Sequence, residues 1–484
     1  MRKIAIILSG LFLFAFSAFS VGCSQNKSAR TSYDIVCALD GDTLVGVETV
    51  DFYNHGENVI KEIKFNLFGN AFRKDAKYSP ISTQYFSKAY PNGISYGGMT
   101  INSVKCGKED LEFSICGEDE NVLLVTLLNE VYPEERVEVV IDYTLKLADV
   151  IARTGYNENT VNLANFYPIV CALDDSGFYE CVYYSSGDPF YSDCSDYKVT
   201  LTADKKYVVA SSGKSVNTLD DGKTLTNTYT AENVRSFAFV LSEKFKVLNG
   251  NALGVDVMYY YYDDASPEKS LEYAIRSVET FTEKFGEYPY KQYSVCQTKF
   301  VQGGMEFPAL VMISDDLTGS AYGEVIVHET AHQWWQTAVG NNEIKYGFLD
   351  EGLAEYSVVV FYENYPEYGM NREDMVKSAE TTYRVYCSVY DKIFGKVDTS
   401  MLRSLGEYKG EYEYVNIAYI KPCIMYDTLR KSVGDNKFFS ALSRYYKQYK
   451  FKNACPDDLV GAFEKVGADS NGFFESFFNG KVII

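Results

Sequence analysis

The chain has 484 residues, 46% of them hydrophobic, and a formal net charge of −20 at pH 7. This length predicts about two or three domains with a substantial buried core. The acidic balance excludes the basic surface that nucleic-acid binding or a polybasic membrane patch requires, and we interpret it as a contribution to solubility.

Residues 1–22 have the pattern of a secretory signal peptide, since Arg2 and Lys3 precede an apolar run. The run ends in Ser20-Val21-Gly22-Cys23, which resembles a bacterial lipobox even though Ser20 replaces the usual Leu. We therefore expect Cys23 to be lipidated and residues 23–32 to form a polar tether. The protein is then an extracytoplasmic lipoprotein of a bacterial cell envelope. The alternative is ordinary signal cleavage with a free Cys23.

The eleven cysteines are spread widely and include no CxxC pair. This spacing indicates neither a cysteine zinc ribbon nor a redox motif. If Cys23 is lipidated, ten remain, an even number that permits disulfides outside the cell. We interpret most of them as small buried residues.

Residues 33–262 are predicted to form an N-terminal β domain. Apolar and polar residues alternate in part along 137–147 and 197–203, and 253–262 is rich in β-forming residues. Clusters of turn residues at 40–42, 54–56 and 220–222 separate such runs. Many short strands without a long helical pattern predict a sandwich or saddle of sheets.

The pattern changes after residue 262, where we place the boundary to a second domain, 263–484. A run of period near 3.6 begins at Ser266 and ends at Gly286, which predicts a helix, and a strand is predicted over 293–298. After residue 361 the chain is predicted to be mostly helical, with candidate helices at 373–390, 419–432, 436–449 and 456–466.

The motif HExxH is formed by His328, Glu329 and His332. Residues four apart lie on one face of a helix, so both imidazoles can bind the same ion. Glu351 follows after eighteen intervening residues. Two histidines and one carboxylate are the ligands of a catalytic zinc site, with Glu329 available as general base. The alternative, a surface helix with two hydrogen-bonded histidines, is disfavoured because the chain has only three histidines.

A glycine-rich stretch, Gly303-Gly304-Met305-Glu306, precedes this motif. Two glycines allow the backbone of a ligand to approach closely, and Glu306 offers a carboxylate where a peptide pairs edge-on. Taken alone, the stretch is equally compatible with a turn that carries a solvated glutamate.

Together these residues resemble a known family. The segments HETAHQWW and FLDEGLAEY, preceded by GGMEF, are similar to motifs of the aminopeptidase N-like gluzincin family, which includes leukotriene hydrolases. Further similarity is found in FGEYPYKQYSV, in the segment that begins GDPFYSDCSDYKVTL, and in Tyr419-Ile420-Lys421-Pro422. The resemblance covers nearly all of the chain that follows the signal segment.

The resemblance implies an α+β fold in which a β-saddle domain packs on a thermolysin-like zinc metallopeptidase domain with a mostly helical C-terminal lobe. It implies one zinc ion per chain, held by the three ligands named above. Glu306 is expected to bind the free amino terminus of a peptide, Tyr419 to stabilise the oxyanion, and Glu355 to orient a ligand histidine. Two residues depart from the family: Phe307 replaces the Asn of GxMEN, and Pro422 replaces the Gly of YxKG.

The sequence therefore predicts a secreted, lipid-anchored zinc aminopeptidase that acts on peptides with free amino termini and has no nucleic-acid partner. A zinc endopeptidase with the same metal site is one alternative. An inactive peptide-binding lipoprotein is a second, and an epoxide hydrolase activity is a third.

Overall fold

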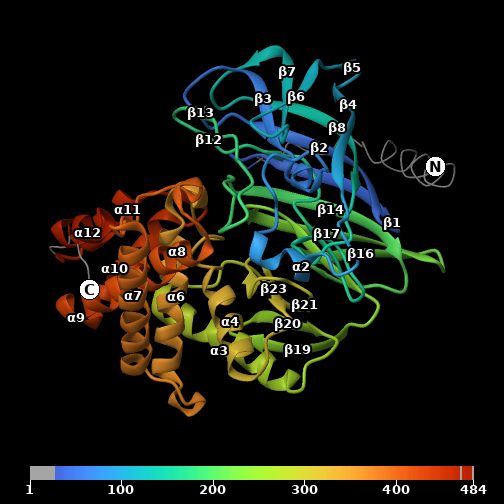
Figure 1. Cartoon of the computed structure of the whole chain (residues 1–484). Helices are drawn as coiled ribbons and strands as arrows, with labels where there is room; N and C mark the ends of the chain where they lie inside the picture. Colours follow the sequence, from blue (N-terminus) through green and yellow to red (C-terminus); the bar gives the residue numbers. More distant parts are fainter. Residues whose placement is uncertain (1–27, 469–470, 482–484) are drawn as a thin grey trace.

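The computed structural model describes residues 28–468 and 471–481. Figure 1 shows a β-rich N-terminal part lying against a second part, in which helices surround a smaller sheet. The α+β architecture expected from the sequence is confirmed. The predicted signal segment and Cys23 lie outside the described residues. None of the described helices is long and apolar enough to cross a membrane.

The N-terminal part is built on an eight-stranded sheet in which only β1 and β14 pair in parallel. Both β1 and β2 alternate buried and half-buried residues, as expected for strands with one face in the core. In sheet order the strands are β16 (Lys214–Asp220), β17 (Thr224–Val234), β14 (Ser195–Asp204), β1 (Ser32–Asp40), β2 (Thr43–Tyr53), β8 (Arg136–Lys146), β4 (Gly98–Cys106) and β5 (Glu109–Asp110).

Two four-stranded sheets and a short hairpin complete the N-terminal part. The first sheet is β15 (Val208–Ser211), β18 (Ala238–Ser242), β10 (Val161–Ala164) and β9 (Thr154–Tyr156). The second is β11 (Ile169–Val170), β3 (Ile60–Asn66), β7 (Val122–Val131) and β6 (Phe113–Cys116), and the hairpin is β12 (Leu173–Asp174) and β13 (Gly177–Phe178). Between β3 and β4 the chain forms η1 (Phe68–Phe72), η2 (Thr83–Tyr85) and α2 (Phe86–Ala89).

The second part begins with a five-stranded sheet. Its order is β19 (Lys246–Ala252), β20 (Val255–Tyr261), β21 (Gln292–Thr298), β23 (Leu310–Ser314) and β22 (Gly304–Met305). The expected boundary near residue 262 therefore falls after two strands, β19 and β20, that hydrogen-bond to this sheet rather than to the N-terminal ones. Sheet membership places the division between β18 and β19.

Helices and short pairings make up the rest of the second part. The helices are α3 (Pro267–Phe285), α4 (Gly319–Ala331), α5 (Glu343–Tyr346), α6 (Phe348–Asn364), α7 (Arg372–Phe394), α8 (Glu411–Val415), α9 (Lys421–Val433), α10 (Asp435–Tyr449), α11 (Pro456–Glu464) and α12 (Asn471–Phe478). Strands β24 (Val339–Asn341) and β25 (Lys452–Ala454) pair in parallel. Two 3₁₀ turns, η3 (Pro366–Tyr368) and η4 (Leu405–Glu407), and a π-helical turn, η5 (Asn416–Ile420), complete the set.

The local patterns account for these helices. Helix α3 has Pro267 at its first turn and ends before Gly286, whose φ of 137° suits a residue without a side chain. Helix α3 packs on α4, and α4 packs on α6, so the two helices that carry the HExxH motif and Glu351 are neighbours. The ten described cysteines are free thiols, and most are buried, as interpreted from the sequence.

Candidate functional site

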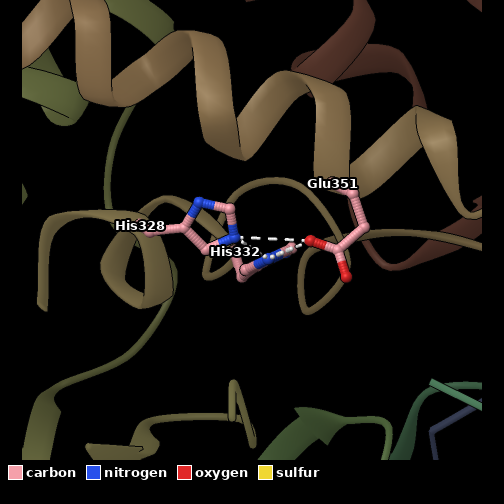
Figure 2. Close-up of side chains that lie close together, drawn as sticks. All are labelled: His328, His332 and Glu351. Carbon is pink, nitrogen blue, oxygen red and sulfur yellow. Dashed lines mark hydrogen bonds and ion pairs between the residues drawn. The ribbon is translucent and has the colours of Figure 1, made fainter. Parts of the chain in front are cut away.

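Helices α4 and α6 bring the three predicted zinc ligands together. His328 lies in the last turn of α4 and His332 caps its C-terminal end, with their Nε2 atoms 3.1 Å apart. Glu351 lies in the first turn of α6. Its Oε2 is 3.3 Å from Nε2 of His328 and 3.2 Å from Nε2 of His332, and Figure 2 shows the three groups converging.

The size of this triangle fits a zinc ion. Nitrogen and oxygen ligands lie about 2.0–2.2 Å from zinc, so neighbouring ligands of a tetrahedral site are about 3.3 Å apart. The three ligand atoms are 3.1–3.3 Å from one another. Both the chemistry of the donor atoms and their spacing therefore suit zinc.

The other ring nitrogen of each histidine has its own partner. Nδ1 of His332 lies 3.0 Å from the backbone oxygen of Trp335, and Nδ1 of His328 lies 3.4 Å from Oε2 of Glu355. An acceptor beside Nδ1 holds the proton there and leaves the lone pair of Nε2 directed at the ion. Glu355 thus lies where the sequence analysis expects a residue that orients a ligand.

The carboxylates around the two histidines favour a positive charge at this position, whether it is carried by an imidazolium or by a metal ion. Burial lowers the pKa of His328, but its contacts with Glu351 and Glu355 outweigh burial and raise that pKa to about 10. Burial raises the pKa of Glu351, yet the two histidines hold it well below its ordinary value. Because His332 and Glu351 are almost fully buried, little water screens these interactions.

Glu329 lies beside the ligands and has a free oxygen. Its carboxylate is buried, and Oε2 has no hydrogen-bond partner among the described residues. Burial is the main reason that its pKa is raised to about 7. A side chain at Gly304 would place Cβ 2.3 Å from Oε1 of Glu329, so only glycine lets strand β22 lie against this carboxylate.

Strand β22 is the edge of the five-stranded sheet. Gly304 pairs with Ile313 and Met305 with Met312, both on β23. Its opposite edge has no strand partner among the described residues, since β22 is the last strand in the sheet order. An extended peptide can add to such an edge through backbone hydrogen bonds.

Glu306 follows this edge strand and is buried, with 3% of its surface exposed. Its Oε1 has no hydrogen-bond partner in the described part of the chain. Burial, and then the nearby Asp188, raise its pKa well above the ordinary value. A buried carboxylate without a partner is costly, and a ligand cation removes that cost.

The Phe307 substitution leaves the backbone after Glu306 anchored. Phe307 is buried, and its carbonyl oxygen accepts a hydrogen bond from Nε2 of Gln333 at 3.2 Å. Oε1 of the same Gln333 accepts from the backbone N–H of Ala309 at 2.8 Å. Since Gln333 follows the ligand His332, this pair of bonds fixes the strand against the metal site.

Tyr419 lies on the π-helical turn η5 and reaches the ligands. Its hydroxyl donates to Oε1 of Glu351, and its ring stacks on His328 with the centroids 5.8 Å apart. Its neighbour Tyr414 packs edge-on against it.

Pro422 is the second residue after this turn. A proline ring clashes with the carbonyl four residues before it in an α-helix, here that of Ala418. The chain widens to a π turn instead, in which the N–H of Lys421 donates to the oxygen of Asn416. A side chain at Gly352 would place Cβ 2.3 Å from Cβ of Pro422, so Gly352 makes room for the ring beside Glu351.

These residues surround one cavity of about 270 Å³. Its lining residues come from both parts of the chain: Arg153, Gly187, Asp188, Gln302, Gly303, Gly304, Glu306, Val325, His328, Glu329, His332, Glu351, Glu355, Glu411, Tyr414, Val415 and Tyr419. Met305 is buried and does not line it. A larger cavity of about 420 Å³, lined partly by His55, Asp193 and Arg235, holds none of the predicted site residues.

Eight of the cavity residues are not among the predicted site residues, and four of these eight have ionisable side chains. Arg153 and Asp188 form a buried ion pair, 2.8 Å from Nη1 to Oδ1, and both belong to the N-terminal part. Glu411 and Tyr414 belong to α8. No local pattern marks them, apart from the turn Gly187-Asp188-Pro189 within a segment that resembles the family.

Comparisons with known proteins find similarity to metallopeptidases. The model of the peptidase family M1 domain matches residues 269–477. Endoplasmic reticulum aminopeptidase 2 of Bos taurus is 22% identical over 399 residues, which are 74% of this chain and 40% of that protein. Aminopeptidase N of Lactococcus lactis subsp. cremoris is 21% identical over 424 residues, 79% of this chain and 46% of that protein. The chain thus spans less than half the length of these relatives.

A solved structure of similar length shares the fold. The M1 zinc metallopeptidase from Deinococcus radiodurans superposes with a TM-score of 0.66 and 16% sequence identity. The match covers 96% of both chains. At this identity the likeness establishes the two-domain architecture and not the roles of individual side chains.

Proposed function

The chain belongs to the aminopeptidase N-like gluzincin family of M1 metallopeptidases, and we propose that it is a zinc aminopeptidase that hydrolyses the N-terminal peptide bond of peptides. The observation that carries this proposal is the buried side chain of Glu306, which lines the same cavity as the predicted metal ligands and has one oxygen without a hydrogen-bond partner among the described residues. The Deinococcus metallopeptidase was solved with a Tyr-Ser-Ala substrate, which supports a peptide as substrate here.

Binding begins at the edge strand. The peptide backbone pairs with the free edge of β22. Its ammonium group lies against Glu306, so a peptide whose amino terminus is blocked binds poorly. Gly303 and Gly304 allow this close approach, because neither carries a side chain into the cavity.

The chemistry is divided between a metal and the side chains around it. His328, His332 and Glu351 would hold a zinc ion, which would supply the Lewis acidity that lowers the pKa of water to about 7. Glu329 accepts a proton from the attacking water and returns it to the leaving amine. The Tyr419 hydroxyl donates to the oxyanion that develops on the scissile carbonyl.

A panel of aminoacyl chromogenic substrates tests the activity. We expect hydrolysis that a chelator abolishes and added zinc restores. Glu306→Ala should damage cleavage of free-amino peptides while zinc remains bound, because the variant loses only the partner of the ammonium group. Equal rates on a peptide and on its N-acetylated form contradict the aminopeptidase assignment and favour an endopeptidase.

Elemental analysis tests the metal site. We expect about one zinc per purified chain, the usual content of a single catalytic site. The double variant His328→Ala, His332→Ala should lose it. His55→Ala is the matched control, because His55 is exposed and pairs with Asp193 away from the cavity. Full zinc retention in the double variant contradicts the assignment.

We also propose that the protein is a lipoprotein of a bacterial cell envelope, on the basis of the lipobox-like Ser20–Cys23 segment. In a bacterial host the wild type should fractionate with membranes and carry an acyl chain at Cys23. Cys23→Ala should remain unacylated. A soluble mature protein whose amino terminus lies elsewhere refutes the lipid anchor.

A further inference from the structure

A short segment of the N-terminal part is attached to a residue that lines the substrate cavity. Residues 83–89, which we call the strap, comprise η2 and α2. Near one end of the strap, the Tyr85 hydroxyl donates to Oε1 of Glu411 at 2.9 Å and Nε2 of Gln84 donates to Oε2. Glu411 is the first residue of α8 and lines the cavity, so both of its oxygens are held by the strap.

The other end of the strap is attached to the loop that precedes α4. Lys88 forms an ion pair with Asp316, which lies between β23 and α4. The final strap residue, Ala89, is buried, and its oxygen accepts a hydrogen bond from the N–H of Ile151 at 2.9 Å. The strap is therefore tied to α8, to the loop before α4 and to its own domain.

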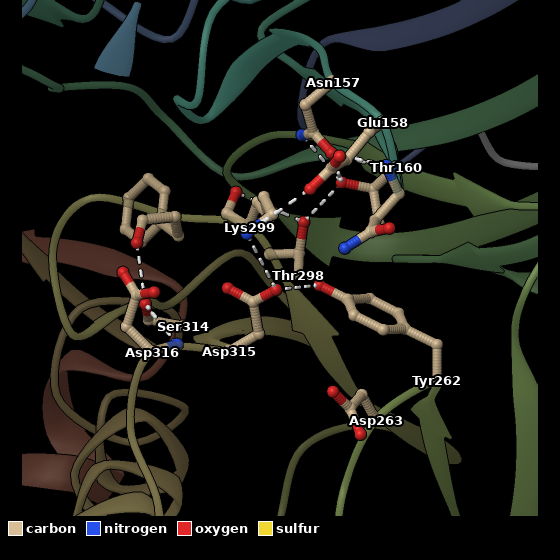
Figure 3. A network of polar contacts seen from close by, with 12 residues as sticks. Asn157, Glu158, Thr160, Tyr262, Asp263, Thr298, Lys299, Ser314, Asp315 and Asp316 are labelled. Atoms are coloured by element: carbon tan, nitrogen blue, oxygen red, sulfur yellow. Dashed lines mark hydrogen bonds and ion pairs between the residues drawn. The ribbon is translucent and has the colours of Figure 1, made fainter. Parts of the chain in front are cut away.

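The Asp316 anchor belongs to a polar network that holds the substrate edge, and Figure 3 shows this network. The Asp316 N–H donates to Oγ of Ser314. Ser314 in turn fixes the glycine-rich loop: its N–H donates to the oxygen of Gly303 at 2.9 Å, and its Oγ donates to the oxygen of Phe300 at 2.7 Å.

The same network ties the loop to the N-terminal part. Oγ1 of Thr298 lies 2.7 Å from Oγ1 of Thr160 and donates to Oδ1 of Asn162 at 2.9 Å. Lys299 lies 3.6 Å from Asp315 and 3.8 Å from Glu158, and Figure 3 shows these contacts side by side. The loop to which Lys88 is anchored is therefore held both to the glycine-rich stretch and to the N-terminal part.

The direction of the substrate brings it to this strap. A peptide that pairs antiparallel with β22, with its amino terminus at Glu306, runs past Gly304 and then Gly303. Gly303 bonds to Ser314, only two residues before the Asp316 anchor. The residues after the scissile bond therefore leave the cavity where the strap is attached. The cavity of about 270 Å³ lies below the usual range of about 300–1,000 Å³ for ligand pockets, which leaves little room for a long chain.

We propose that the strap is a specificity determinant, which favours short peptides because a longer chain must displace it before binding; this rests on the proposed aminopeptidase function. The contacts that hold the strap are weak enough for it to open. The Lys88–Asp316 pair is exposed, with 43% and 47% of the two side chains accessible, and exposed ion pairs hold weakly. Apart from Ala89, which is buried, and Tyr85, which is half-buried, the strap residues are exposed.

A peptide-length series tests the proposal. Peptides of two, three, five and ten residues with the same first residue are compared by kcat/KM in the wild type, in Lys88→Ala and in Gln84→Ala, Tyr85→Phe. If the open strap is a minor state, the variants should improve on the decapeptide relative to the dipeptide by about five- to tenfold. Hydrolysis of an aminoacyl anilide, which does not reach the strap, should stay within about twofold of the wild type.

Two controls separate gating from general loosening. Lys77→Ala removes the Lys77–Glu118 ion pair. Lys77 lies in the same connection between β3 and β4 as the strap but does not line the cavity, so this change should leave the length preference unchanged. Reversal of the anchor, Lys88→Asp with Asp316→Lys, should restore the wild-type preference that either single change loses.

An unchanged length preference in both strap variants, with folding verified by thermal unfolding, overturns the proposal. So does a wild type that cleaves the decapeptide as well as the dipeptide. Failure of the wild type on the anilide instead contradicts the proposed function, so the two failures are distinguishable.

Discussion

Tyr419 makes two contacts that decide its position relative to the metal ligands. Its hydroxyl donates to Glu351, and its ring stacks on His328. Both contacts place a phenol beside the predicted zinc ligands on the cavity wall, where the oxygen of a substrate carbonyl is expected. The tyrosines at 408, 412, 414 and 426 are the alternatives, and among them only Tyr414 lines the cavity.

Tyr419→Phe tests the role of this hydroxyl. The change removes a donor whose partner carries charge only in the transition state, so kcat should fall about a hundred- to a thousandfold with little change in KM. Zinc content should stay unchanged. Steady-state kinetics on an aminoacyl anilide provide the measurement.

Tyr426→Phe is the matched control, since the Tyr426 hydroxyl is buried, lacks a hydrogen-bond partner among the described residues and is absent from the cavity lining. It should keep wild-type kcat. A Tyr419→Phe enzyme whose kcat is within about threefold of wild type excludes Tyr419 as the oxyanion donor, and Tyr414 is then the next candidate.

At the scale of elements, the π turn η5 continues directly into helix α9, and the two position Tyr419 together. The wider π turn accommodates Pro422 without a clash. Lys421, the residue after the turn, hydrogen-bonds to helix α12. The Lys421 ammonium is fully buried and donates to the backbone oxygens of Thr399, at 2.5 Å, and Phe477, at 2.6 Å. A lysine two residues after Tyr419 therefore ties the turn to distant parts of the chain.

The titration of Lys421 predicts how stability depends on pH. Burial lowers its pKa to about 7, whereas a lysine in an unfolded chain titrates near 10.4. Between these values the unfolded state binds more protons, so the free energy of unfolding rises with pH, by at most about 1.4 kcal/mol per pH unit. Below about pH 7 both states are protonated, and the full cost of burying the charge remains.

Lys421→Met removes this titration. The free energy of unfolding of the variant minus that of the wild type should be most positive below about pH 7 and should decrease as the pH rises toward 9.5. Denaturant unfolding at several pH values measures it. Lys447→Met, an exposed change on α10, should give a difference that is constant with pH. A constant difference for Lys421→Met as well contradicts a lowered pKa.

At the scale of the whole molecule, Arg235 joins the two parts of the chain. It follows β17 and is buried, with 4% of its surface exposed. Its guanidinium donates to the oxygens of Gln336 at 2.8 Å, Ser192 at 2.7 Å and Lys452 at 2.6 Å. The guanidinium occupies the space that a side chain at Gly340 would fill, since Cβ there would lie 2.0 Å from Cζ.

We call Arg235 a clamp because its hydrogen bonds join the two parts of the chain. Its replacement should weaken the contact between them. Arg235→Ala leaves several buried carbonyl oxygens without partners, so it should reduce the free energy of unfolding by about 3–5 kcal/mol. Arg384→Ala, an exposed change on α7, should stay within about 0.5 kcal/mol.

Zinc binding provides a second measurement of the clamp. Gln336 and Thr337 both accept from Arg235, and the Thr337 N–H donates to the oxygen of the ligand His332 at 2.9 Å. We therefore expect Arg235→Ala to bind zinc more weakly than Arg384→Ala does. Wild-type stability in Arg235→Ala contradicts the role of Arg235 as a clamp.

The sequence by itself determined the features that depend on neighbours along the chain. The i, i+4 spacing of His328 and His332 places both on one face of α4 whatever surrounds the helix. The period of 3.6, with Pro267 and Gly286 at the ends, delimited α3 to within a residue. The glycine at 304 predicts the close approach of a ligand backbone, and the structure adds a second reason for glycine there, the carboxylate of Glu329 that lies against it.

Only the tertiary structure decided which strands pair and which distant residues meet. Strands β19 and β20 have the same local pattern as those of the N-terminal sheets, yet they join the sheet that carries Glu306. Arg153 and Asp188 reach the cavity from the N-terminal part, and Glu411 bonds directly to the strap. A strand's alternation reports which face is buried but not which partner its backbone bonds, because every strand offers the same donors and acceptors. Contacts between distant segments are therefore decided by packing of the whole chain.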